Sequence, residues 1–169
     1  YDLPPFRGCV SCLACKLKGR ETGLCAVRDS LADTLRAVNE ADGFVLASPI
    51  YFSEWTAVAR AFLERLVFPW LRYTDFSLAA PKKMPVAFLY TMNAPESMMP
   101  GIRQHLSILE GAVARALGDP APAFVEAHST VQVKDYSRYA MDGLDPAAHL
   151  AWRDAHWESE IGRASCRER

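Results

Sequence analysis

The sequence predicts an α/β fold in which a parallel sheet carries helices on both faces. Three apolar runs, at residues 44–47, 85–90 and 123–127, have the length of strands. The first two lack polar alternation, as expected of strands that are buried on both faces. Segments with the spacing of amphipathic helices separate these runs, so that helices and strands alternate from Leu31 onward. This alternation is typical of a parallel sheet with crossover helices.

The first helix is expected to begin at a capping box formed by Ser30 and Asp33 and to end at Gly43. Its buried stripe is predicted to consist of Leu31, Leu35 and Val38.

The second helix is predicted from Glu54 to about Leu66, because one face of this segment is apolar. That face carries Val58, Ala59, Phe62, Leu63 and Leu66. Three charged residues on the same helix are expected to face water or a partner: Arg60, Glu64 and Arg65.

A third helix is predicted from about Pro100 to a stop at Gly118, and a final amphipathic helix after Pro146. Residues 1–160 are predicted to form a single domain. Residues 161–169 resemble the translation of a sequencing-adapter oligonucleotide, and we expect them to be a non-native tail that packs against nothing.

Length and charge restrict the class of protein. With 169 residues the chain is long enough for one domain with a substantial core. A net charge of −1 argues against partners such as nucleic acid or a membrane surface. No apolar run approaches the length that spans a bilayer.

Four of the five cysteines lie close to the start of the chain: Cys9, Cys12, Cys15 and Cys25. A disulfide framework spreads its cysteines along the sequence, so this crowding indicates a reduced, cytoplasmic thiol or metal cluster. Three thiols at two-residue spacing resemble the start of a [4Fe–4S] site. A closed tetrahedral zinc site and a loop of free thiols are the alternatives.

The stretch after the first strand is a candidate ligand site. Pro49 directs the chain out extended rather than into a helical turn, so residues 48–53 are predicted to form an exposed loop at the carboxyl end of a parallel strand. Ligands of open α/β sheets bind at that edge. The loop offers backbone N–H groups, two aromatic rings and a hydroxyl, which suit a planar polar ring better than a phosphate. A second loop at the same edge is expected at residues 91–95.

Several segments, in their order and spacing, resemble the flavodoxin-fold family of NADPH-dependent FMN reductases and iron–sulfur flavoproteins. The similarity runs from about Tyr1 to about Tyr139. The segments that carry it are Gly8 to Lys16, Gly23 to Asp29, Glu40 to Gly43, Ser48 to Phe52 and Arg60 to Arg65.

The resemblance implies a doubly wound parallel sheet of strand order 2-1-3-4-5. Members of the family begin with a strand, a phosphate-binding loop and a helix, whereas residues 1–3 correspond to the end of the second strand. Strand 1 and helix 1 are therefore expected to be missing from this chain, and a further segment is expected before Tyr1.

The resemblance also implies the site residues. The isoalloxazine contacts of the family map onto Ser48, Pro49, Ile50, Tyr51 and Phe52 and onto Thr91, Met92 and Asn93. Backbone donors there would stabilise the reduced flavin and an aromatic side chain would cover one ring face. Plain core packing is the alternative for the two aromatic residues, and an ordinary strand-to-helix loop is the alternative for residues 91–93. Cys25 is the implied fourth ligand of the cluster.

These features predict a cytoplasmic FMN-dependent oxidoreductase that moves electrons from NAD(P)H to a small-molecule or protein acceptor, as a homodimer or higher homo-oligomer. An electron carrier of the flavodoxin or iron–sulfur flavoprotein type is the alternative, although flavodoxin-type carriers are usually strongly acidic and this chain is nearly neutral. A metal-stabilised binding module without redox activity is a further alternative.

Overall fold

The computed structural model describes residues 4–164, with side chains described as far as residue 160. The main helices are α1 (Ala32–Glu40), α2 (Ala57–Val67), α3 (Met99–Leu117) and α4 (Pro146–Ala164). The strands are β1 (Phe44–Tyr51), β2 (Glu54–Trp55), β3 (Val86–Thr91) and β4 (Ala123–Ala127). Short 3-10 helices occur at Ala14–Lys16, Phe68–Trp70, Glu96–Met98 and Tyr136–Arg138.

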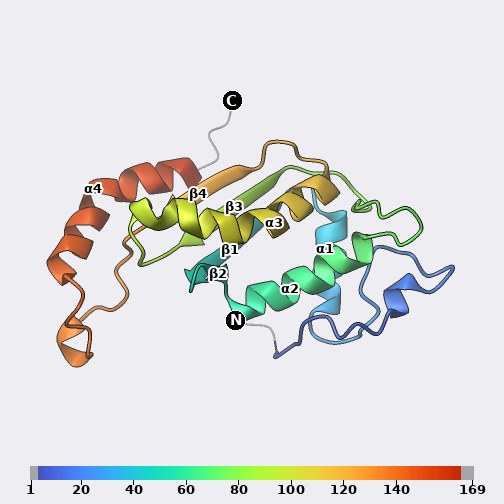
Figure 1. The fold of residues 1–169 in the computed structure, drawn as a ribbon, viewed down its shortest axis with the longest axis horizontal. Helices are drawn as coiled ribbons and strands as arrows, with labels where there is room; N and C mark the ends of the chain where they lie inside the picture. The colour runs from blue at the N-terminus through green and yellow to red at the C-terminus, as the bar shows by residue number, and fades with distance from the viewer. Residues whose placement is uncertain (1–3, 165–169) are drawn as a thin grey trace.

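One sheet has the order β2-β1-β3-β4 (Figure 1). β1, β3 and β4 run parallel, and the short β2 turns back antiparallel to the end of β1. This arrangement confirms the predicted α/β class. The neighbours β1, β3 and β4 agree with strands 3, 4 and 5 of the expected order, while the described residues contain no strand at the positions of strands 2 and 1.

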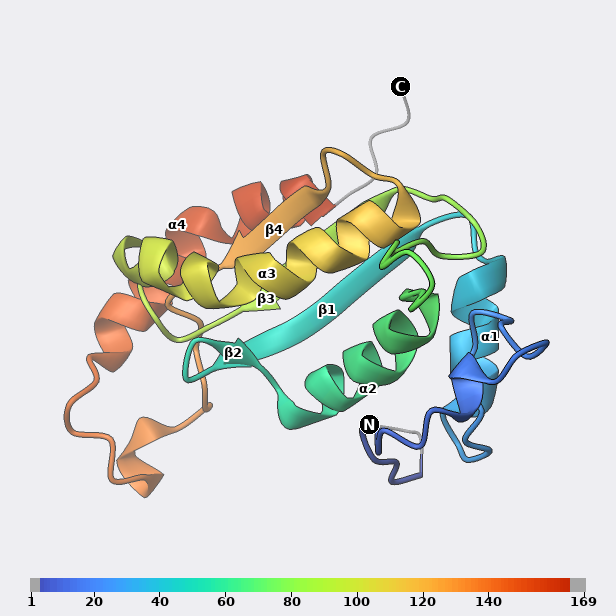
Figure 2. The same ribbon diagram turned by 45° about the vertical axis from the view of Figure 1, so that its right-hand side comes forward.

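The main core lies between the sheet and the helices α2 and α3, which cover the same face (Figure 2). Alternate strand residues point into this layer, as the two-residue period of a strand requires. The fully buried side chains at its centre are Leu63, Phe88, Tyr90, Leu106, Val113 and Leu117.

The opposite face of β1 is open, which corrects the prediction that this strand is buried on both faces. Val45 is 65% exposed and Ala47 is exposed as well. The reason is that α4 contacts β4, which lies at the edge of the sheet farther from β1 (Figure 2). The edge of β1 away from β3 is also unpaired along Phe44–Pro49 in the described part of the chain, because β2 reaches only Ile50 and Tyr51.

The structure corrects both ends of α1. Ser30 does not cap this helix; its hydroxyl donates to the Pro4 carbonyl oxygen at 2.9 Å. Asp29 instead accepts from the Leu31 N–H at 3.1 Å. The helix ends at Glu40, before the predicted stop at Gly43.

α2 begins later than predicted, because a tight hairpin precedes it. Phe52 and Ser53 have φ of 52° and 64°, so the chain reverses and Glu54–Trp55 pairs with the end of β1. Thr56 then caps α2, its hydroxyl oxygen accepting from the Ala59 N–H at 3.2 Å.

The later elements agree closely with the prediction. α3 ends at Gly118, whose φ of 73° is the left-handed conformation typical of a glycine cap. The backbone of α4 is described as far as Ala164. The prediction that residues 161–169 pack against nothing concerns side chains that lie outside those described. Within the described residues, no helix is both long and apolar enough to cross a membrane.

Candidate functional site

The first predicted flavin segment is a strand end and a turn rather than an open loop. Ser48, Pro49, Ile50 and Tyr51 continue β1, which corrects the predicted loop over residues 48–53. Ser48 is buried, and its hydroxyl donates to the Pro49 carbonyl oxygen at 2.8 Å and accepts from the Thr56 N–H at 3.4 Å. This serine therefore joins the strand end to the start of α2.

The two aromatic residues of this segment are not in the core. Phe52 is fully exposed at the turn, and Tyr51 is 59% exposed beside it. Ile50, in contrast, belongs to the core. The core-packing alternative is therefore wrong for Tyr51 and Phe52.

The second predicted segment lies beside the first, because Pro49 and Thr91 are partners in the parallel register of β1 and β3. Met92 is buried in the core, and its N–H donates to the Ala127 carbonyl oxygen at 2.9 Å. The Asn93 amide donates to the Thr130 carbonyl oxygen at 3.4 Å. Thr91 and Asn93, which are half-buried, are thus the members of this segment nearest to solvent.

A cavity of about 680 Å³ lies next to the first segment. Ser48 and Pro49 line it together with Thr56 and Val58 at the start of α2, and apolar side chains such as Leu46 form other walls. Its volume is within the range of small-molecule and cofactor pockets. Val58, predicted to be buried, is 46% exposed because it lies on this wall. The N-terminus of α2 carries partial positive charge, which favours a ligand with negative charge.

The four predicted metal-ligating cysteines line a second, much smaller pocket of about 20 Å³. All are free thiols: Cys9 and Cys12 are exposed, Cys15 is buried and Cys25 is half-buried. Burial raises the pKa of the Cys15 thiol, and the charge of Lys16 opposes this effect.

The cysteine loop, residues 9–15, has a special backbone. Ser11 and Leu13, on either side of Cys12, have φ of 54° and 57°, a left-handed conformation that is uncommon outside glycine. The Ser11 N–H lies 3.5 Å from the Cys9 sulfur and donates to it. The loop thus turns a backbone donor toward one of its own thiols.

The loop is fastened to α2 and the turn that follows it. The Cys9 N–H donates to Glu64 at 3.2 Å. The Lys16 ammonium donates to three carbonyl oxygens just after α2: Phe68 at 2.5 Å, Pro69 at 3.2 Å, and Leu71.

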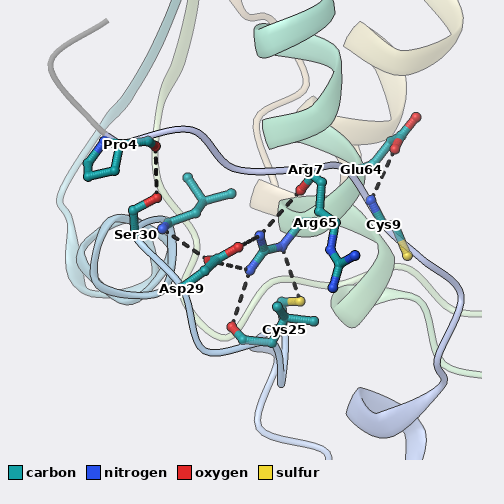
Figure 3. Close-up of polar contacts among 10 residues, drawn as sticks. Pro4, Arg7, Cys9, Cys25, Asp29, Ser30, Glu64 and Arg65 are labelled. Atoms are coloured by element: carbon teal, nitrogen blue, oxygen red, sulfur yellow. Dashed lines mark hydrogen bonds and ion pairs between the residues drawn. The ribbon is translucent and has the colours of Figure 1, made fainter.

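Arg65 is the residue that sequence reasoning misplaced most clearly. It is 1% exposed instead of facing water or a partner. Its guanidinium group makes two bonds to Asp29, at 2.6 and 3.0 Å, and single bonds to the Arg7 and Val27 carbonyl oxygens (Figure 3). Its Nε–H donates to the sulfur of Cys25 at 3.3 Å. These bonds use all five N–H donors of the side chain. The pKa of Asp29 is lowered chiefly by the hydrogen bonds from Arg65.

A second polar cluster, largely buried, lies between β3, β4 and α3, and no local sequence pattern indicates it. Arg103 donates to Glu110 at 2.9 Å and to Glu126, and its guanidinium lies over the Phe124 ring at 4.2 Å. The Tyr90 hydroxyl donates to Glu110 at 2.7 Å, and burial raises the pKa of this tyrosine. None of these side chains lines the 680 Å³ cavity, so we interpret the cluster as part of the core.

The two sites fit their expected groups to different degrees. The larger cavity has the volume and apolar walls that suit a flavin ring, and Ser48 and Thr56 add two hydroxyl residues to its lining. The cysteine pocket has the sulfur donors that zinc and iron prefer. Its volume is that of about one water molecule, which suits a single ion but not a cluster of four irons and four sulfides. Among the side chains that the structure describes, no three possible ligands are grouped closely enough to hold a metal, so binding requires the sulfurs to draw together.

Comparison with known proteins decides the family. Residues 2–121 match the sequence profile of the family described as NADPH-dependent FMN reductase. The chain belongs to this family. An iron–sulfur flavoprotein of Archaeoglobus fulgidus is 36% identical over 59 residues, which cover 35% of this chain and 25% of that protein. An iron–sulfur flavoprotein of Methanocaldococcus jannaschii is 35% identical over 57 residues, covering 34% of this chain and 28% of that protein.

The matched segment spans about a quarter of the length of these two relatives. Among solved structures, Smu.1420 from Streptococcus mutans UA159 has a TM-score of 0.52 at 18% identity, covering 80% of this chain and 71% of its own. This similarity supports the fold, and the family match confirms the resemblance inferred from the sequence.

Proposed function

We propose that this chain forms the FMN-binding part of an oxidoreductase that moves electrons from NAD(P)H to a small-molecule or protein acceptor. The observation that carries the proposal is the 680 Å³ cavity beside Ser48 and Pro49, where the parallel pairing of β1 and β3 ends, in a chain of the FMN reductase family. Open α/β sheets bind their ligands at that edge.

Bound FMN would supply the hydride and electron chemistry; the residues of the chain would bind and orient it. Ser48, Pro49 and Thr56 are placed to contact the ring, since all three line the cavity. The N-terminus of α2 would stabilise negative charge on the reduced ring. The apolar walls would exclude water, which strengthens this electrostatic effect.

The other predicted contacts take different roles in this proposal. Ile50 and Met92 lie in the core, where they would stabilise the strand ends that border the site. Thr91 and Asn93, beside Pro49 at the same edge, would border it. Tyr51 and Phe52 lie on the exposed hairpin outside the cavity walls, and we propose that they cover the outer face of the ring or contact the second subunit of a homodimer.

We also propose that Cys9, Cys12, Cys15 and Cys25 hold a metal, either as a [4Fe–4S] cluster or as a single zinc ion. Convergence of four free thiols on one pocket supports this proposal, as do the names of the two curated relatives. A [4Fe–4S] cluster requires a larger pocket than the one described, whereas a single ion requires only that the sulfurs move closer together. Free thiols also favour a reducing compartment such as the cytoplasm.

Anaerobic purification of the full-length protein tests both parts. We expect a flavin absorption spectrum that bleaches when NADPH or NADH is added, because the bound ring would accept hydride. Iron and acid-labile sulfide analysis separates a cluster from zinc. A folded protein that retains no flavin at saturating FMN would contradict the proposed function. A full content of FMN with no iron, sulfide or zinc would contradict only the metal site.

A further inference from the structure

Helix α2 connects the two candidate sites. It begins at Thr56 on the cavity and, near its other end, carries the side chains that hold the cysteine pocket. Glu64 accepts the Cys9 N–H, and its neighbour Arg65 donates to the Cys25 sulfur (Figure 3).

Cys25 is the thiol with the most firmly fixed hydrogen-bond donor. The guanidinium that donates to it is buried, and the other four N–H groups of Arg65 are held by Asp29, Arg7 and Val27. A planar guanidinium group that is held in this way cannot rotate without breaking several hydrogen bonds at once. Its Nε–H direction is therefore set by the fold.

Among the described hydrogen bonds, the other three thiols have no side-chain donor. Cys9 and Cys12 are exposed, and the loop that carries them contains the two left-handed residues Ser11 and Leu13. Such non-glycine conformations are strained and cluster where a loop serves a ligand. Arg65 thus gives Cys25 a fixed side-chain donor that the exposed Cys9 and Cys12 do not have.

We propose that Arg65 is the positioning residue of the metal pocket: it holds the sulfur of Cys25 as a fixed ligand, to which the other three sulfurs are added when a metal binds. The inference rests on the proposed metal site and adds a residue outside the cysteine motif. A ligating thiolate gains from an N–H donor, because the hydrogen bond disperses its negative charge. Partners of this kind orient the ligands and change metal affinity by about 10- to 100-fold when they are removed.

Cobalt(II) titration of the reduced protein under anaerobic conditions tests the proposal, with thiolate-to-cobalt absorption as the readout. Arg65→Lys keeps the charge but loses the fork, so we expect cobalt affinity to fall about 10- to 100-fold. In a Cys25→Ser background the same substitution should cause no further loss, since its effect passes through that sulfur. Arg103→Lys is the matched control, an arginine with two carboxylate partners and no bond to a cysteine, and it should leave cobalt affinity unchanged.

Three results would overturn the proposal. If Arg65→Lys is folded and binds cobalt as the wild type does, Arg65 does not position the ligand. If Arg65→Lys weakens binding equally in the Cys25→Ser background, its role is general stability. If the wild type itself binds no cobalt, the metal pocket fails together with the role of Arg65, while FMN binding stays a separate question.

If Arg65→Lys fails to fold, a measurement on the wild-type protein tests the role of Arg65 instead. With cadmium-113 in the pocket, the Arg65 Nε–H should show a scalar coupling to the metal through the Cys25 sulfur. A cadmium-loaded protein whose Arg65 Nε–H shows no such coupling would overturn the proposal.

Discussion

Asp29→Asn should destabilise the protein strongly, because it removes the charge partner of a buried arginine. The Asp29 carboxylate accepts two bonds from Arg65, whose side chain is 1% exposed. Removing one partner of a buried ion pair costs about 3–5 kcal/mol. The Asp29 side chain is 25% exposed, so we expect the low end, about 3 kcal/mol of unfolding free energy.

Asp33→Asn is the matched control for this prediction. Asp33 makes an ion pair of the same length, 2.6 Å, with Arg36, but both side chains are largely exposed. Such surface pairs contribute about 0–1 kcal/mol. Urea unfolding followed by circular dichroism at neutral pH should therefore separate the two variants by about 2 kcal/mol or more. Equal losses in the two variants would refute the argument from burial.

The effect of Asp29→Asn should also depend on pH. The pKa of Asp29 is lower in the folded protein than in the unfolded chain, so its contribution is fully present above the unfolded value of about 3.9. As the pH falls through the folded pKa the carboxylate is protonated and the contribution is lost. Wild type and variant should thus converge in strongly acidic solution. A difference that persists there would show that the carboxylate charge is not its source.

Three further predictions concern other parts of the fold. Glu110→Gln should lower the unfolding free energy by about 1–3 kcal/mol, measured by urea unfolding, because it weakens the buried bond from the Tyr90 hydroxyl. Lys16→Met should speed amide hydrogen exchange in the cysteine loop, followed by mass spectrometry, because the ammonium no longer fastens the loop to three carbonyl oxygens. Phe52→Gly should leave stability unchanged or raise it by up to about 1 kcal/mol, since glycine relieves the left-handed backbone at an exposed position. An unchanged unfolding free energy in Glu110→Gln, an unaltered exchange rate in Lys16→Met, or a clear loss of stability in Phe52→Gly would each contradict its prediction.

The sequence predicted the order of elements well because local signals determine it. β4 has the predicted limits, and α3 stops at the glycine where it was expected to stop. The β1–β2 hairpin was missed because its two turn residues, Phe52 and Ser53, are not the glycine or asparagine that usually signals such a turn. The prediction therefore extended α2 backward over residues that form β2.

Arg65 was misplaced for a different reason. Helical spacing groups it with charged neighbours, and its partners Asp29 and Cys25 lie 36 and 40 residues away in the sequence. No local pattern shows that a carboxylate and a thiol from another segment will surround it. The open face of β1 was missed similarly, since an apolar run such as Phe44–Ala47 does not reveal how many helices cover it.

FMN titration of the purified full-length protein tests the central claim most directly. Flavin fluorescence measures binding, and Pro49→Gly combined with Tyr51→Ala tests the location of the site at the end of β1. We expect saturable, stoichiometric FMN binding by the wild type and clearly weaker binding by the double variant, with circular dichroism unchanged. FMN affinity that is the same in both folded proteins would contradict the placement of the flavin at this edge of the sheet.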